Sequence, residues 1–176
     1  MESPFRRLRG AIAGAMPFLI AVVLAMLISV PLQVPHVGAI APYLTLAAVY
    51  YWAVFRPDLF GYGAAFCLGL FTDIMTGAPL GLGALVLVAV LAVSVTQRRF
   101  FLGKPFHILW WGFALIAPVA MVLTWLLASI YSGMFLPIGP VLLQAVVTVA
   151  LFPAVAWVLG RCHALLPRVP ASAKAG

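Results

Sequence analysis

The chain has 176 residues, of which 66% are hydrophobic and only 7% are charged. Soluble domains carry about 25% charged residues, so this composition excludes an ordinary soluble domain. A membrane-spanning helix needs about 20 apolar residues, which leaves room for five or six spans and for no separate soluble domain. The composition therefore predicts a small, all-α integral membrane protein.

Ten basic and three acidic residues give a net charge of +7. The basic residues cluster at the ends of apolar segments, as expected of loops that face anionic lipid, and form no basic face with interleaved aromatics. Nucleic acid is therefore not expected as a partner. The three histidines and two cysteines show no metal-ligand spacing, and paired carboxylates and enzyme motifs are missing from the sequence. We expect no metal, no cofactor and no catalytic activity.

Six apolar segments lie between a basic leader over residues 1–10 and a basic, flexible tail over residues 161–176, so residues 11–160 are expected to form a six-span membrane domain. The first run is too long for the apolar region of a signal peptide and is interpreted as a retained span. Near the end of the second span, Tyr50, Tyr51 and Trp52 are expected at the headgroup boundary. The spans are predicted over residues 11–30, 38–55, 59–76, 80–96, 106–131 and 141–159, the last two with internal prolines.

The distribution of charge predicts the orientation of these spans. All ten Lys and Arg residues fall in the leader, the turn at 56–58, the loop at 98–104 and the tail, whereas the three alternate loops hold none. The positive-inside rule places basic segments in the cytoplasm. Both termini are therefore expected to be cytoplasmic.

One acidic residue, Asp73, lies inside the third predicted span, about one turn before its non-cytoplasmic end. An acid at mid-bilayer costs about 3 kcal/mol, and no Lys or Arg is expected on that side to pair with it. Two interpretations stay open: a buried polar clamp that joins helices, or a contact for a partner or ligand at a cavity. The candidate hydrogen-bonding neighbours are Thr72, Thr76, Gln33, His36 and Tyr43.

Gly61, Ala65 and Gly69 precede Asp73 at intervals of four residues. Such a stripe of small residues lets another helix approach closely, and we expect that helix to belong to the same chain, although a homo-oligomer is the alternative. Thr124, Gln144 and Thr148 are expected to form ordinary hydrogen bonds between helices.

At the cytoplasmic end, Arg56, Pro57 and Asp58 form a predicted tight turn. Asp58 is expected to cap the third helix, because a carboxylate at that position can accept hydrogen bonds from the first free N–H groups. The alternative for this turn is a docking point for a cytoplasmic partner.

An ordered set of motifs lies within residues 42–83. The motifs are Pro42-Tyr43-Leu44, Tyr51-Trp52, Arg56-Pro57, the glycine-rich run 61–69, Leu70-Phe71-Thr72-Asp73 and Pro79-Leu80-Gly81. This set resembles the bacterial rod shape-determining MreD family. The match in length, span count and orientation covers nearly the whole chain, and beyond residues 42–83 the likeness is only one of hydropathy.

The resemblance implies a non-enzymatic, multi-pass subunit of the cell-wall elongation machinery in the bacterial inner membrane. Its implied partners are MreC and, in the same complex, MreB filaments, the RodA glycosyltransferase and a class B penicillin-binding protein, with lipid around it. The family is also similar in architecture to the substrate-binding S components of energy-coupling-factor vitamin transporters. An S-component-like bundle is therefore expected, and a vitamin-binding subunit is the alternative function, although likeness of fold does not transfer function.

Overall fold

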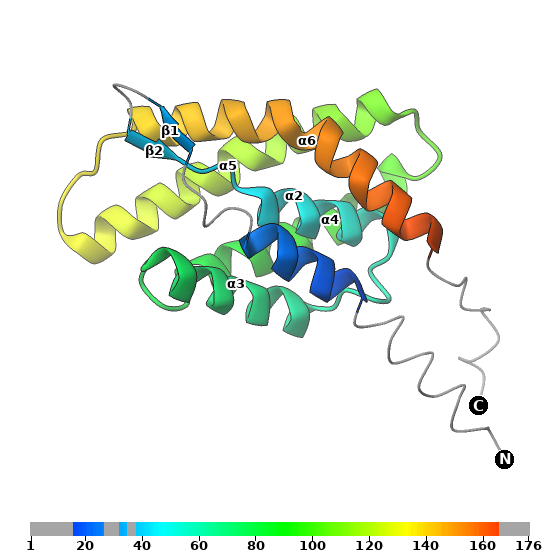
Figure 1. Ribbon diagram of the computed structural model, residues 1–176, viewed down its shortest axis with the longest axis horizontal. Coiled ribbons are helices and arrows are strands. Elements are labelled where there is room, and N and C mark those ends of the chain that lie inside the picture. The colour runs from blue at the N-terminus through cyan, green and yellow to red at the C-terminus, as the bar shows by residue number, and fades with distance from the viewer. Residues whose placement is uncertain (1–15, 27–31, 35–37, 166–176) are drawn as a thin grey trace, which may run out of the picture.

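The computed structural model describes residues 16–26, 32–34 and 38–165, and the chain in these ranges folds into six helices and one short hairpin (Figure 1). From α2 onward, successive helices run in opposite directions (Figure 1), because the connections between them are only a few residues long. The elements are the helix Met16–Met26, β1 (Leu32–Val34), β2 (Gly38–Ile40), α2 (Leu44–Phe55), α3 (Tyr62–Thr76), α4 (Leu82–Phe101), α5 (Phe106–Ser132) and α6 (Gly139–Leu165).

Three of these helices are long and apolar enough to cross a bilayer: α4, α5 and α6 over Gly139–Cys162. Their outer faces carry large apolar side chains, such as Leu115 at 73% and Val119 at 65% exposure, which suit hydrocarbon rather than water. The other three described helices have 10–17 residues each. The predicted helical class is confirmed, whereas the number of six spans and their orientation stay predictions.

The second apolar segment differs from the prediction in its first part. The helix α2 begins at Leu44 rather than at Gly38, and the residues before it form an antiparallel pair with β1, in the register Leu32↔Ile40 and Val34↔Gly38. Pro42 provides the physical reason, because a proline disfavours helical geometry in the residue before it and so keeps the preceding chain extended.

The aromatic residues of α2 lie in the core, so the prediction that they mark the headgroup boundary was wrong. Every residue from Thr45 to Val54 is buried, and Tyr50 and Trp52 have no exposed surface. The Tyr50 hydroxyl donates to the carbonyl of Leu109 at 3.1 Å. A helix that is apolar on all sides is an interior helix. α2 is accordingly the axis around which α4, α5 and α6 pack.

The bundle has a basic end. α2, α4 and α6 end where α3 and α5 begin (Figure 1). Arg98 and Arg99 belong to the last turn of α4 rather than to a loop, where their charges lie at the negative end of the helix dipole. Every Lys and Arg in the described ranges lies at this end, namely Arg56, Arg98, Arg99, Lys104 and Arg161. The opposite end holds the hairpin, the 77–81 turn and the 133–138 loop.

Candidate functional site

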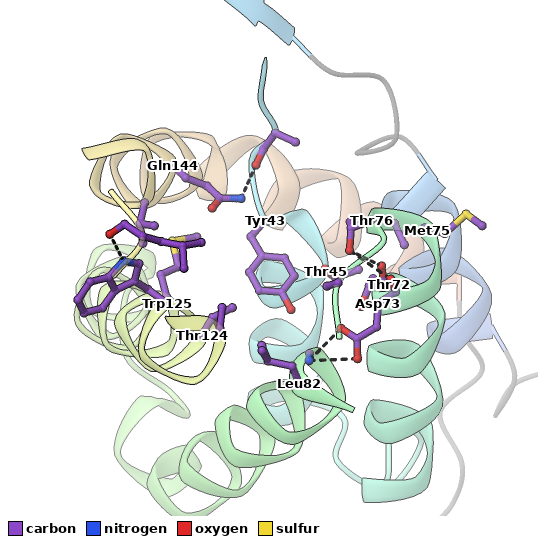
Figure 2. Close-up of a pocket in the computed structure, with 18 residues that line it drawn as sticks. Tyr43, Thr45, Thr72, Asp73, Met75, Thr76, Leu82, Thr124, Trp125 and Gln144 are labelled. Atoms are coloured by element: carbon purple, nitrogen blue, oxygen red, sulfur yellow. Dashed lines mark hydrogen bonds between the residues drawn. The ribbon is translucent and has the colours of Figure 1, made fainter. Parts of the chain in front are cut away.

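Asp73 joins the end of α3 to the start of α4. Its main-chain carbonyl accepts hydrogen bonds from the N–H groups of Gly77 and Ala78, which end α3. Its carboxylate accepts from the N–H of Gly81 at 2.8 Å and from the N–H of Gly83 at 2.9 and 3.2 Å, at the start of α4. Figure 2 shows both carboxylate oxygens directed at this helix terminus. One residue therefore holds both ends of the turn.

This arrangement explains how an acid that is 3% exposed is stabilised away from the basic end. The first N–H groups of a helix have no intrahelical acceptor, and the helix dipole makes that terminus partly positive. The Asp73 carboxylate supplies the acceptor and the opposite charge. Of the two interpretations left open by the sequence, the geometry supports a buried polar clamp.

Two glycines at the start of α4 make the clamp possible. Gly81 has φ +96°, a conformation that other residues rarely adopt, and this places its N–H toward Asp73. A Cβ added to Gly83 would collide with the Asp73 carboxylate. The clamp therefore requires glycine at both positions, eight and ten residues after the acid.

Of the two glycines in the predicted stripe of small residues, one allows a second helix to approach closely, as expected. A Cβ added to Gly69 would overlap the backbone of Ala84, so the two helices touch backbone to backbone at this point. Ala65 is fully buried between them. Gly61 lies just before the helix, and a Cβ there would meet nothing within 4 Å. The close approach lies within the chain.

A cavity of about 290 Å³ lies beside the clamp and is called the Asp73 cavity. Its residues come from α2–α6, the helix Met16–Met26 and the segments around them, and Figure 2 shows their side chains around the cavity. The Tyr43 side chain lines the cavity together with Thr72 and Asp73 (Figure 2). Most of the lining is apolar; the polar members are Tyr43, Thr45, Thr72, Asp73, Thr76, Thr124, Trp125 and Gln144.

Most polar atoms of the Asp73 cavity are already bonded within the chain. Thr72 donates to the carbonyls of Leu68 and Gly69, and Thr76 donates to the carbonyl of Thr72. Neither hydroxyl bonds the Asp73 carboxylate as the sequence suggested. Thr45 differs, because its hydroxyl is fully buried and has no hydrogen-bond partner among the described residues.

The start of α2 is fixed by α6. The Gln144 side chain donates to the carbonyl of Ala41 at 2.6 Å, and the N–H of Tyr43 donates to the Thr148 hydroxyl at 2.9 Å. The Tyr43 N–H is at the N-cap of α2, one of the N–H groups that an isolated helix would leave unbonded, and the Ala41 carbonyl belongs to the segment just before the helix. Gln144 and Thr148 thus join elements as predicted, although through backbone groups, whereas Thr124 bonds the carbonyl of Ala120 in its own helix.

Arg56, Pro57 and Asp58 lie at the basic end, far from Asp73 along the bundle. The turn is closed by the N–H groups of Leu59 and Phe60, which donate to the carbonyl of Arg56. The prediction that Asp58 caps α3 was wrong, because the helix begins after Gly61 without a side-chain cap and Asp58 is exposed. The buried Phe60 ring fixes the chain between the turn and the helix.

Several residues of the site were not given their role from the sequence: Gly81 was named only within the Pro79-Leu80-Gly81 motif, and Gly83, Thr45 and Trp125 were not named as site residues. Gly81 and Gly83 are the donors to Asp73, Thr45 and Trp125 line the cavity, and the Trp125 indole donates to the carbonyl of Leu136 at 3.0 Å. The Gly-Leu-Gly spacing after Pro79 was the available signal for the first two. Two candidates, His36 and the Gln33 side chain, lie outside the described part of the chain.

The site offers little for catalysis. The Asp73 carboxylate is occupied by three backbone hydrogen bonds, and Asp58, the other acid of the described chain, lies at the opposite end of the bundle. Within the described ranges, no three His, Cys, Asp or Glu side chains converge as a metal site would require. The arrangement joins helices and encloses a small, mostly apolar cavity.

Fold and site together define a small helical membrane protein whose buried acid organises a helix–helix turn. The model of the rod shape-determining protein MreD family matches residues 6–161, which is most of the chain. The chain belongs to this family and is a rod shape-determining membrane protein. Comparisons with curated proteins and with solved structures found no match.

Proposed function

We propose that this protein is a non-enzymatic, multi-pass subunit of the cell-wall elongation complex in the bacterial inner membrane. In this proposal it pairs with MreC and connects MreB filaments with the peptidoglycan synthases, RodA and a class B penicillin-binding protein, so that the cell keeps its rod shape. The observation that carries the proposal is the family match over residues 6–161.

The short connections between the helices support a role in assembly. The described turns between helices, such as 56–61, 77–81 and 133–138, are only a few residues long. With so little material outside its helices, the part of the chain from α2 to α6 offers partners helix faces and short loops. In membranes such contacts rely on close packing and a few polar groups rather than on a large soluble interface.

Within this proposal the motif residues have different tasks. Asp73, Thr72 and Thr76 shape the end of the bundle around the Asp73 cavity, and Gly69 and Ala65 pack α3 against α4. Arg56, Pro57 and Asp58 form the exposed turn at the basic end, which is available to a cytoplasmic partner.

Depletion of the protein in its rod-shaped host tests the function directly. We expect rods to become spheres, and we expect the native gene supplied in trans to restore rods. Residue-pair crosslinking in the same cells should join single cysteines on the outer faces of α5 or α6 to MreC. Normal rods after clean deletion would refute the proposal, whereas spheres without any MreC crosslink would refute only the pairing.

The alternative, a substrate-binding subunit of a vitamin transporter, has no support from the family match. The Asp73 cavity also has few polar atoms that remain available, since most of them bond within the chain.

A further inference from the structure

A second apolar depression lies at the basic end, between α2, α5 and α6. It has a volume of about 290 Å³ and is called the Trp157 groove. Four aromatic rings form its walls, and the helix α6 supplies two smaller residues. The residues that define it are Tyr51, Phe55, Phe106, Pro153, Ala156 and Trp157.

Pro153 explains why the groove forms at this point of α6. Proline has no N–H and its ring clashes with the carbonyl four residues earlier, so a helix bends there. That carbonyl belongs to Val149, and it accepts a hydrogen bond from the Trp110 indole at 3.0 Å instead. Figure 1 shows α6 changing direction in its second half. The bend is thus stabilised by α5, and the space beside it is built into the fold.

The groove is apolar inside and basic at its mouth. The Arg161 guanidinium lies over the Trp157 ring at 4.8 Å from its centroid, and Arg56 directly follows Phe55. Lys104 lies two residues before Phe106, but its ammonium group lies over the Phe100 ring of α4, which is not part of the groove, at 5.0 Å from the ring centroid. The acid at this end of the described chain is Asp58, which is exposed in the turn after Arg56. An apolar slot next to uncompensated cations matches an amphiphile with an anionic head.

We propose that the Trp157 groove binds an anionic phospholipid of the leaflet that surrounds the basic end. One acyl chain fills the aromatic groove, and the head group lies against Arg161, with Arg56 following Phe55 at the end of α2. An acyl chain needs no hydrogen-bond partner, and the lining provides few: among its side chains Tyr51 and Trp157 carry polar atoms. This inference does not depend on the proposed role in cell-wall elongation.

Retention of lipid by the full-length protein tests the proposal. The protein is exchanged into bilayer discs of phosphatidylethanolamine with a graded fraction of phosphatidylglycerol, then released into mild detergent, and the lipids that stay bound are counted by native mass spectrometry. We expect one phosphatidylglycerol to be retained in preference to phosphatidylethanolamine. Equal retention of the two lipids, or retention of neither, would overturn the proposal.

Two substitutions with the same change of charge localise the site. Arg161→Gln should reduce the affinity for phosphatidylglycerol about fivefold, the effect of one cation near an anionic lipid surface. Arg99→Gln is the matched control, since Arg99 is exposed at the same end but lies on α4, which does not line the groove. Equal losses in the two variants would show diffuse attraction to the basic end and would contradict a defined site.

A third variant tests the acyl chain separately from the head group. Trp157 is 63% exposed, so Trp157→Ala removes one wall of the groove without hollowing the core. We expect weaker retention of phosphatidylglycerol at every salt concentration, whereas the Arg161→Gln effect should shrink as salt rises because charges are screened. Unchanged retention by the Trp157→Ala variant would place the lipid elsewhere and overturn the assignment.

Discussion

Asp73 shows how a carboxylate can be stable inside a membrane bundle without a cationic partner. Its two oxygens take three hydrogen bonds from the N–H groups of Gly81 and Gly83, at the positive end of α4. Charge-assisted hydrogen bonds of this kind are about twice as strong as neutral ones. The acid thereby connects two helices through their backbones.

Replacing Asp73 should weaken the turn between α3 and α4. Asp73→Ala leaves two buried N–H groups without acceptors, and although it also removes a buried charge, we expect a net loss of about 2 kcal/mol of folding free energy. The measurement is equilibrium unfolding of the purified protein in mixed micelles.

Thr76→Val is the control for this change, because the Thr76 hydroxyl is exposed and bonds a carbonyl of its own helix. It should alter stability by less than about 0.5 kcal/mol. An Asp73→Ala variant as stable as the Thr76→Val variant would show that the clamp contributes nothing to the fold.

The sequence predicted the position of Asp73 and the type of its role, but not its partners. Side chains were considered as partners, and those of Thr72 and Thr76 bond their own helix instead. Almost every residue type has a backbone N–H group, so the sequence does not show which N–H groups bind a side chain. Gly81 and Gly83 gave only an indirect signal. Gly81 is needed for its positive φ and Gly83 for the space that the Asp73 carboxylate occupies, but the glycines alone do not identify Asp73 as their partner.

Gly69 is the glycine of α3 at which this helix comes closest to the backbone of α4. At Gly69 the backbones of the two helices meet, whereas Gly63, six residues earlier in α3, faces open space. Small residues at a helix interface allow this approach in membranes. The two glycines therefore provide a matched pair within one helix.

Gly69→Ala should separate α3 from α4 and destabilise the protein by about 2 kcal/mol, a typical cost of overpacking. Gly63→Ala should instead stabilise it by about 0.5 kcal/mol, because alanine reduces the entropy of the unfolded chain and meets no obstacle. Thermal unfolding in detergent distinguishes the two. Similar midpoints for both variants would contradict backbone contact at Gly69.

The start of α2 depends on α6 in a similar way. Gln144→Leu removes the donor to the carbonyl of Ala41 and should cost about 1 kcal/mol, the net value of a typical hydrogen bond. Thr124→Val is its control, since that hydroxyl bonds within α5. Unfolding in mixed micelles measures both, and a larger effect of Thr124→Val would exclude the anchoring role of Gln144.

The limits of sequence reasoning are clearest in α2 and the hairpin before it. A short apolar run fits a strand, an interior helix or part of a span equally well, so the pattern did not distinguish Gly38–Ile40 from the helix that follows. The rings of Tyr50 and Trp52 were interpreted as interfacial because both residue types are common there. Their burial depends on the helices around α2, which come later in the chain.

At the scale of the whole bundle, the distribution of charge in the structure agrees with the distribution expected from the sequence. The bundle gathers every described Lys and Arg at one end (Figure 1). Folding brings the connections 56–61 and 102–105 to the same end as the terminus of α6 (Figure 1). The fold is therefore compatible with the expectation that the basic segments all lie on one side of the membrane. Which side this end faces stays a prediction.

Labelling of single cysteines tests which side the basic end faces. In a background with Cys67→Ala and Cys162→Ala, the variants Lys104→Cys and Met134→Cys place one thiol at each end, and both positions are exposed. A reagent that does not cross the inner membrane should label the Met134→Cys variant in intact cells and the Lys104→Cys variant only after permeabilisation, because cationic segments stay in the cytoplasm. Labelling of both in permeabilised cells shows that each thiol is reactive. If the Lys104→Cys variant is labelled from outside, the basic end faces away from the cytoplasm, and its proposed contacts with cytoplasmic filaments are excluded.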